Sequence, residues 1–434
     1  MKQINNFVGN IKGVGYSTNK RKIINDPVYG FISIPGDLIY DIIEHPWFQR
    51  LRNIRQLGLT SFVYPGANHS RFQHCLGAMY LMETALRTLR NKGVGIGDKE
   101  EEAALIAILL HDIGHGPFSH ALEMSLINGI RHEDLSLLLM QRMNDNFDGS
   151  LDMAIDIFKG EYPRNFLHEL IAGQMDMDRL DYLRRDSFFT GVIEGSVGSD
   201  RIIRMLNVID DSLVIDEKGI YSAEKFLIAR RLMYWQVYMH KTVLSSESLL
   251  AKVLARAKEL AMGGADLFAT PALRFFLYNN IGAAEMESRG MFSPAFIAAN
   301  FTRLDDSDIL ASAKYWADHS DPVLSDLAGR LIRRNLFAIE LQNEPFNEER
   351  IHDLTQRAVS EMKIRPEASG YYVFTDAISN LTYAPDEPEV RILLKGGTAA
   401  GIREVSDMFN HDLVSDRVTK YFLCYPKELR SIKK

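Results

Sequence analysis

The sequence is poor in cysteine and contains no long apolar run. Its 434 residues include two cysteines, Cys75 and Cys424, and neither stands in a CxxC pair. Two cysteines are too few for a disulfide framework and suit a reducing compartment. We interpret Cys75 as a small apolar filler and not as a nucleophile. The longest apolar run, at 103–110, is far shorter than the about 20 residues that span a bilayer.

An excess of positive charge and an apolar leader are also missing. The formal net charge is −7, whereas a general nucleic-acid binder normally carries a basic surface. The composition therefore gives no strong nucleic-acid signal, although it is compatible with a local basic pocket. Residues 1–20 hold no apolar h-region of the kind found in signal peptides. We expect a cytoplasmic protein that has no membrane partner.

Helical periodicity is what the sequence does have. Apolar residues recur at helical spacing from residue 38 to about 257, for example Phe48, Leu51 and Ile54. The run 103–110 is apolar on every side and predicts a buried central helix. Near the end of the chain the pattern changes to short runs of β-branched and aromatic residues, at 371–374, 390–394 and 421–425.

These patterns predict a mainly α fold with a helical core and a small C-terminal α/β lobe. The expected core at 1–257 includes a short N-terminal segment, and a helical extension follows at 258–345. The α/β lobe is expected at 346–434, because the apolar runs there are short and are separated by turns that contain proline or glycine.

The most informative stretch is 109–120, LLHDIGHGPFSH. An apolar helix delivers the pair His111–Asp112, and the glycines and proline that follow are expected to end that helix. Burying an imidazole and a carboxylate together is costly unless something compensates. A metal ion is the natural compensation, because it pairs with both groups. His111 and His115 would share one face if the helix extended that far.

Two further segments can complete a metal site. His74 lies near the start of a predicted helix upstream, and Asp178 lies in the acidic run 175–182 downstream. With the pair His111–Asp112 they form a mixed nitrogen and oxygen set that suits iron, manganese, zinc or magnesium. The set leaves positions for water and phosphate oxygens, and the metal would lower the pKa of its water. Taken alone, a histidine such as His74 is more often an ordinary core residue, and an acidic run is more often the solvated face of a helix. The prediction of a metal site therefore depends on the joint occurrence of these residues.

The order of these ligands is the point at which a family resemblance emerges. His74, then His111–Asp112, then Asp178 resembles the H…HD…D pattern of the HD phosphohydrolase superfamily. Longer stretches are similar to the deoxynucleoside triphosphate triphosphohydrolases, namely PWFQRLRNIRQLG, YPGANHSRFQHCLG, LLHDIGHGPFSHALE, RHED, DMDRLDYLRRD and VYMHK. The resemblance is strong from residue 22 to about 250 and weaker beyond. It implies a divalent metal held by the four residues, and hydrolysis of dNTPs to deoxynucleoside and intact triphosphate.

The resemblance also implies roles around the metal. Residues suited to protonate the leaving 5′-oxygen, or to relay a proton to it, are His115, His120, His132 and Glu133. Matches to the family's triphosphate contacts are Arg71, Arg179, Arg230 and Tyr182. Matches to its sugar contacts are Gln56, Leu57, Asp186 and Tyr238. A tyrosine ring pressed against C2′ would exclude a 2′-hydroxyl by steric contact, which is a physical reason for deoxyribose selectivity.

A second nucleotide site is implied near the N-terminus. Relatives in this family are activated by nucleotides bound between subunits, and the matching positions here are Lys22, Asn25, Glu44, Gln49 and Arg52. Glu44 stands where the vertebrate member of this family has an aspartate that recognises guanine. A guanine base bound here would therefore meet a longer carboxylate side chain. We therefore expect a homo-oligomer, either a dimer or a tetramer, with a nucleotide activator as a hypothesis.

Two other functions stay open at this point. The first is an HD phosphohydrolase that acts on a monophosphate, a ribonucleotide or an alarmone. A monophosphatase needs fewer cations, so the joint presence of Arg71, Arg179, Arg230 and Tyr238 favours a deoxynucleoside triphosphate. The second is a catalytically silent nucleotide sensor or nucleic-acid-binding module, which would have no need of the metal ligands.

Overall fold

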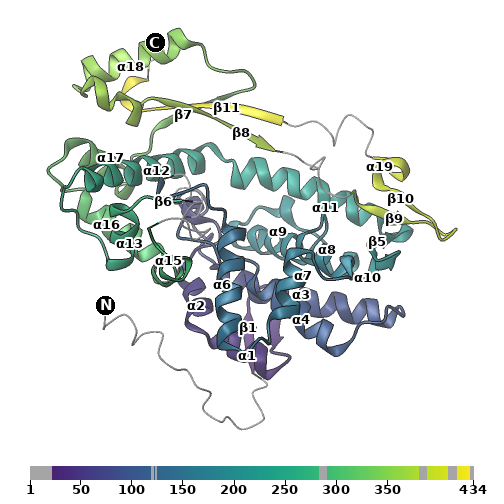
Figure 1. The fold of residues 1–434 in the computed structure, drawn as a ribbon. Helices are drawn as coiled ribbons and strands as arrows, with labels where there is room; N and C mark the ends of the chain where they lie inside the picture. Colours follow the sequence, from purple (N-terminus) through teal and green to yellow (C-terminus); the bar gives the residue numbers. More distant parts are fainter. Residues whose placement is uncertain are drawn as a thin grey trace.

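The fold is built mainly from helices packed around one continuous apolar core (Figure 1). The computed structural model describes residues 22–118, 122, 125–282, 291–380, 389–408 and 418–430. Within these residues the mainly α fold class predicted from the periodicity is confirmed. No helix in the described ranges is long and apolar enough to cross a membrane.

The described chain begins with a short antiparallel hairpin of β1 (Ile23–Asp26) and β2 (Gly30–Ser33). Its turn is stabilised by Asp26, whose Oδ1 accepts the backbone N–H groups of Val28 at 2.9 Å and Tyr29 at 3.0 Å. Short helices then cover the side of the core. They are α1 (Asp37–Glu44), α2 (Pro46–Gln49) and the 3₁₀ turns η1 (Arg50–Asn53) and η2 (Gly58–Phe62).

Three helices form the centre of the molecule: α3 (Arg71–Asn91), α4 (Asp98–Leu110) and α9 (Met177–Thr190). Helix α3 packs against both α4 and α9. All of residues 103–110 in α4 are buried, as its apolar sequence predicts. At Gly77 the helices α3 and α9 approach so closely that an added Cβ would lie 2.0 Å from Oδ1 of Asp181.

The remaining helices surround this centre. The helices up to residue 262 are α6 (His132–Asn146), α7 (Asp152–Lys159), α8 (Asn165–Ala172), η3 (Ile193–Gly195), α10 (Ser199–Met205), η4 (Glu217–Gly219), α11 (Ile220–Met233), the π-helical η5 (Tyr234–Tyr238) and α12 (Lys241–Met262). The extension contains α13 (Pro271–Tyr278), α15 (Pro294–Phe301), α16 (Asp306–Trp316) and α17 (Pro322–Ile332). It is joined to the core by parallel pairing of β3 (Ile127–Asn128) with β6 (Ile281–Gly282).

A three-stranded antiparallel sheet lies at one end of the molecule, together with helix α18 (Glu348–Glu361) (Figure 1). Its strand order is β7 (Ala338–Gln342), β11 (Val418–Tyr425) and β8 (Phe374–Asn380). The 3₁₀ turns η6 (Pro366–Tyr371) and η7 (Lys427–Leu429) complete this part. Leu354 and Ala358 of α18 pack with Leu423 and Tyr425 of β11 in a small separate core.

A second sheet joins two strands that follow α10 to two strands near residue 400. The hairpin of β4 (Leu206–Ile209) and β5 (Ser212–Asp216) pairs in parallel with β9 (Arg391–Leu393), which pairs in turn with β10 (Ala399–Gly401). Helix α19 (Ile402–Val405) follows. The run at 390–394 thus pairs with the edge of β5, and β7 begins before residue 346. A short apolar run has no local signature of its partner strand, so the pairing of β9 with β5 could not be predicted from the sequence.

Candidate metal centre and substrate site

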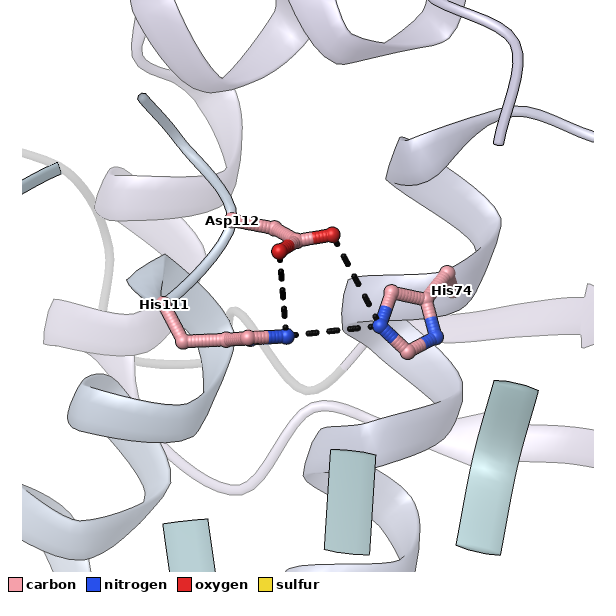
Figure 2. A group of neighbouring side chains, drawn as sticks. All are labelled: His74, His111 and Asp112. Carbon is pink, nitrogen blue, oxygen red and sulfur yellow. Dashed lines mark hydrogen bonds and ion pairs between the residues drawn. The ribbon is translucent and has the colours of Figure 1, made fainter. Parts of the chain in front are cut away.

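Two helices bring three of the predicted metal ligands together (Figure 2). His74 lies in the first turn of α3, and His111–Asp112 directly follow the last residue of α4. The Nε2 atoms of the two histidines are 3.3 Å apart. Oδ1 of Asp112 lies 3.3 Å from Nε2 of His111, and its Oδ2 lies 3.7 Å from Nε2 of His74. All three ligand atoms are therefore within reach of one ion.

Helix α4 ends just before the ligand pair, so His111 and Asp112 lie in the turn that follows it. Helix α4 ends at Leu110, and His111 is already its C-cap. The hydroxyl of Ser136 in α6 accepts the Gly114 N–H at 2.9 Å and donates to the His111 carbonyl at 2.7 Å. Nδ1 of His111 donates to the Ile108 carbonyl at 2.6 Å, so Nε2 presents its lone pair to the ligand cluster. The helix does not extend to His115, so the condition for His111 and His115 to share one helical face is not met.

The fourth predicted ligand, Asp178, comes from the first turn of α9. The preceding Asp176 caps this helix by accepting the Arg179 N–H at 2.6 Å. Oδ1 of Asp178 then lies 3.0 Å from Nε2 of His74 and 3.5 Å from Nε2 of His111. The side chain is 29% exposed, which leaves one side of the cluster accessible.

The electrostatics of this cluster fit a bound cation. Burial alone would lower the pKa of His74, but hydrogen bonds to Asp178 and Asp181 outweigh it and raise the pKa to about 10. Burial likewise opposes ionisation of Asp112, yet His111, His115 and Arg71 hold its pKa well below the usual range. A proton between His74 and Asp178 is thus strongly favoured, and a divalent cation would supply the same compensation to this nitrogen and oxygen set.

The candidate proton-transfer residues lie beside Asp112. Nε2 of His115 is 3.1 Å from Oδ1 of Asp112, and its ring stacks on His132 with 3.9 Å between ring centroids. Nδ1 of His132 is 3.5 Å from Oε2 of Glu133. Burial, together with the charge of Arg71, lowers the pKa of His115 well below its usual range. His120 lies outside the described residues.

The predicted phosphate contacts come from three helices. Arg71 in α3 donates to Oδ2 of Asp112 at 2.5 Å, while its buried Nε has no hydrogen-bond partner among the described residues. Arg179 in α9 pairs with Asp176 at 2.6 Å. Arg230 in α11 donates to Oε1 of Gln174 at 3.1 Å. The α9 helix also carries Tyr182 one turn after Asp178.

The predicted sugar contacts gather around Asp186, which is 1% exposed. Its Oδ2 accepts the Tyr238 hydroxyl at 2.7 Å, and its Oδ1 lies 2.7 Å from Nε2 of His69. The Tyr238 ring meets Tyr182 edge-on, with 6.1 Å between centroids. The Gln56 N–H donates to the His69 carbonyl, and the buried Oε1 of Gln56 has no partner in the described part of the chain.

The π-helical turn η5 ends at Tyr238, and Leu57 is the N-cap of η2. His240 is the N-cap of the next helix, α12, so η5 and α12 are separate elements. The π-helical register therefore places Tyr238 on the side that faces Asp186.

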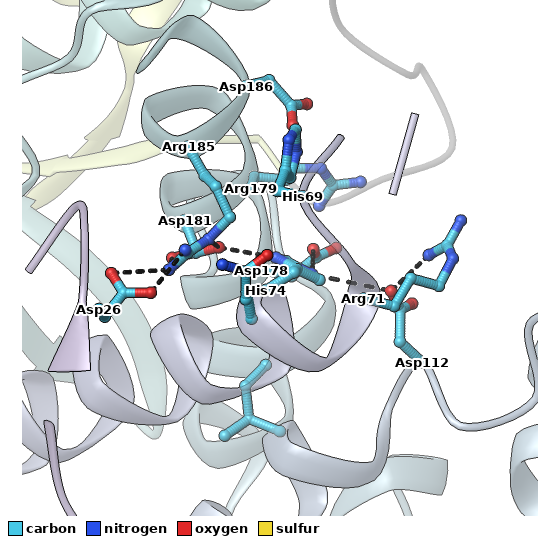
Figure 3. A network of polar contacts seen from close by, with 12 residues as sticks. Asp26, His69, Arg71, His74, Asp112, Asp178, Arg179, Asp181, Arg185 and Asp186 are labelled. Atoms are coloured by element: carbon cyan, nitrogen blue, oxygen red, sulfur yellow. Dashed lines mark hydrogen bonds and ion pairs between the residues drawn. The ribbon is translucent and has the colours of Figure 1, made fainter. Parts of the chain in front are cut away.

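Several neighbours of the cluster were not assigned a role from the sequence (Figure 3). Asp181 accepts a hydrogen bond from Nδ1 of His74 at 2.8 Å, and His69 and Gln174 contact Asp186 and Arg230. The sequence indicated these residues only in part, because each lies close to a residue with a predicted role. Asp181 follows Asp178 by three residues, and His69 precedes Arg71 by two. Neither spacing reveals which atom each side chain contacts.

The residues predicted for an activator lie on the N-terminal hairpin and the short helices that follow. Asn25 is in β1 and Lys22 precedes it, with the Lys22 ammonium donating to the Tyr40 hydroxyl. Glu44 is the last residue of α1 and is exposed. Nε of Arg52 donates to Oε1 of Gln49 at 2.7 Å.

Two family models and several known proteins are similar to this chain. A family model described as an HD domain matches residues 71–184, and one described as an HD associated region matches residues 197–268. The uncharacterised protein YwfO of Bacillus subtilis is 33% identical, over 95% of this chain and 93% of its own. A Dictyostelium discoideum homologue of the deoxynucleoside triphosphate triphosphohydrolase SAMHD1 is 32% identical, over 58% of this chain and 56% of its own. The crystal structure of a Bacteroides thetaiotaomicron phosphohydrolase has 54% identity and a TM-score of 0.90, and covers 94% of this chain and all of its own.

Proposed function

The chain belongs to the HD-domain phosphohydrolase family, and from that premise we propose that it hydrolyses deoxynucleoside triphosphates to deoxynucleoside and triphosphate. The match of the HD domain begins at Arg71 and ends at Arg184, so it includes all four candidate ligands. Relatives named as deoxynucleoside triphosphate triphosphohydrolases support this choice of substrate.

The observation that carries the proposal is the contact of Tyr238 with Asp186, on the helix that also supplies the candidate ligand Asp178. Asp178, Tyr182 and Asp186 lie on one face of α9, one turn apart, and Tyr238 donates to Asp186 across from them. The carboxylate of Asp186 can accept a hydrogen bond from a 3′-hydroxyl. The ring of Tyr238 would lie against the sugar and leave no room for a 2′-hydroxyl.

The cations nearby suit a triphosphate. Arg71, Arg179 and Arg230 come from three different helices, α3, α9 and α11. A triphosphate carries about four negative charges, and guanidinium groups hold phosphate oxygens with paired hydrogen bonds. Nε of Arg71 and Oε1 of Gln56 are buried and have no hydrogen-bond partner within the described ranges, and a bound nucleotide can satisfy them.

The candidate ligands His74, His111, Asp112 and Asp178 would hold a divalent metal that polarises phosphorus and activates water. The stacked pair of His115 and His132 would manage the proton that the leaving 5′-oxygen needs. Because His115 is held neutral by burial, it would bind the phosphate as a hydrogen-bond donor, and His132 with Glu133 would relay the proton.

The test is product analysis with a panel of dNTPs and NTPs in the presence of Mn²⁺. We expect deoxynucleoside and intact triphosphate from dNTPs, resolved by anion-exchange chromatography. Asp112→Ala and His74→Ala should each lose bound metal and at least about 100-fold of turnover. The exposed Asp145→Ala is the matched control and should keep both.

Two results would contradict the proposal. Release of inorganic phosphate alone, or no turnover of any dNTP, would overturn the substrate and favour an HD phosphohydrolase for another phosphoester. Wild-type turnover by Asp112→Ala or His74→Ala would overturn the metal assignment.

A further inference from the structure

Both ring nitrogens of the candidate ligand His74 contact a carboxylate. The ring is fully buried, and its Nε2 faces Asp178 and the candidate metal position. Its Nδ1 lies 2.8 Å from Oδ2 of Asp181, which is also fully buried. A carboxylate that accepts the Nδ1–H of a histidine fixes the ring and makes Nε2 a stronger donor to a metal.

Asp181 is itself part of a longer buried chain of charges (Figure 3). Arg185, one turn later on α9, donates to Asp181 through Nε at 2.9 Å and Nη2 at 3.0 Å. The same guanidinium donates through Nη1 to Oδ2 of Asp26 at 2.7 Å. Arg185 is fully buried, so it is held between two carboxylates without competition from water.

The chain ends in the N-terminal hairpin. Asp26 is the last residue of β1, and its Oδ1 also accepts two N–H groups of the hairpin turn. A movement of β1 relative to α9 would therefore change the contact with Arg185. The fully buried guanidinium would then interact more strongly with Asp181, and the hydrogen bond between Asp181 and Nδ1 of His74 would become weaker.

We propose that Asp26 acts through Arg185 and Asp181 as a positioning residue for His74, so that the hairpin β1–β2 sets the affinity of the metal centre. This rests on the proposed metal role of His74 and not on the proposed substrate. The hairpin also carries Asn25, one of the candidate activator contacts. A ligand bound there would reach the metal through three side chains.

Metal affinity of the purified apoprotein tests the relay. Asp26→Asn keeps an oxygen for the hairpin turn but removes the charge opposite Arg185. We expect its Kd for Mn²⁺, measured by EPR titration of free Mn²⁺, to rise about 10-fold. The Co²⁺ absorption spectrum should change as well, because His74 would no longer hold its orientation.

The matched control is Asp321→Asn. Asp321 likewise accepts a backbone N–H, from Leu324 at 2.8 Å, and pairs with an arginine, Arg256, at 2.7 Å. It lies at the start of α17, outside the metal cluster, so its loss should leave the Kd for Mn²⁺ unchanged. Arg185→Lys keeps the positive charge but loses the guanidinium that donates to Asp26 and Asp181 at once. It should therefore weaken Mn²⁺ binding, as Asp26→Asn does.

A double variant decides whether the effect travels through Asp181. Asp181→Asn should raise the Kd by about 10–100-fold, and adding Asp26→Asn to it should change nothing further. If Asp26→Asn binds Mn²⁺ as tightly as Asp321→Asn, or if its effect adds in full to that of Asp181→Asn, the relay is wrong. If the wild type binds no Mn²⁺, both the metal role of His74 and the relay fail.

Discussion

At the scale of single residues, His45 makes the stability of the fold depend on pH. His45 separates α1 from α2 and caps α2 by accepting the Trp47 N–H on its Nδ1 at 3.3 Å. Its ring also meets Trp47 edge-on, at 5.2 Å between centroids. Burial lowers its pKa from 6.5 to about 4. The native state therefore requires the neutral ring.

This shift has a definite sign. Above pH 6.5 both states carry a neutral His45, and the stability is fully present. As the pH falls from 6.5 to about 4, the unfolded chain takes up a proton that the native chain resists, and about 3 kcal/mol is lost. His45→Asn keeps a capping oxygen and should remove this part of the loss. Urea unfolding at pH 7 and pH 4.5 measures it.

The control for this prediction is His352→Asn, which changes an exposed histidine on α18 and removes no buried group. If His45→Asn loses as much stability as the wild type between the two pH values, burial of His45 is not the cause.

The candidate metal cluster shows what residue types can reveal without a structure. His74, His111, Asp112 and Asp178 were identifiable because their order matches a long motif, and the structure brings them together. Asp181 was noted only as part of an acidic run. Its contact with His74 depends on how α3 and α9 are rotated against each other, and that rotation is a property of packing.

At the scale of elements, helix α6 packs closely against the turn after α4, beside the candidate metal centre. An added Cβ at Gly114 would lie 2.2 Å from both the His132 carbonyl and the Ser136 nitrogen. Gly114→Ala must therefore push the start of α6, with His132, away from His115. We expect the free energy of unfolding to fall by about 2 kcal/mol. Turnover should fall more than Mn²⁺ affinity.

The matched control for Gly114→Ala is Gly95→Ala, where an added Cβ meets nothing within 4 Å. Its stability in urea should stay within about 0.5 kcal/mol of the wild type. A Gly114→Ala protein with wild-type turnover and wild-type stability would show that neither property depends on the close packing of α6 against the turn after α4.

Elements were predictable to different degrees. Helix α4 was evident because every residue of 103–110 is apolar, but its end at Leu110 was not, since the Ser136 hydroxyl that holds the turn comes from α6. Strand β9 was read correctly as an extended run. Its partner β5 could not be read, because strand pairing between distant segments leaves no local pattern.

At the scale of the whole molecule, we expect assembly to depend on nucleotide. The hairpin β1–β2 exposes Ile23 and Phe31, at 63% and 71%, beside the candidate activator residue Asn25. A nucleotide bound between copies of the chain would lie against this surface. The molecular mass on gel filtration should therefore increase when dGTP is added.

Charge reversal makes this expectation specific. Arg52→Glu disrupts the pair of Gln49 and Arg52 and should abolish the response to dGTP. Arg204→Glu, an exposed residue at the end of α10, is the control that should keep it. A monomer both with and without dGTP would contradict nucleotide-dependent assembly.

The parallel pairing of β5 with β9 also sets an order for the synthesis of the molecule. Strand β5 leaves the ribosome long before β9, and at about 5–20 residues per second its edge waits roughly 10–35 seconds for its partner. During that time an unpaired strand edge beside α8 and α10 is open to other chains. The sheet beside the HD domain is thus completed only after β9 has been made, well after β5, and each newly made copy depends on that later segment to close it.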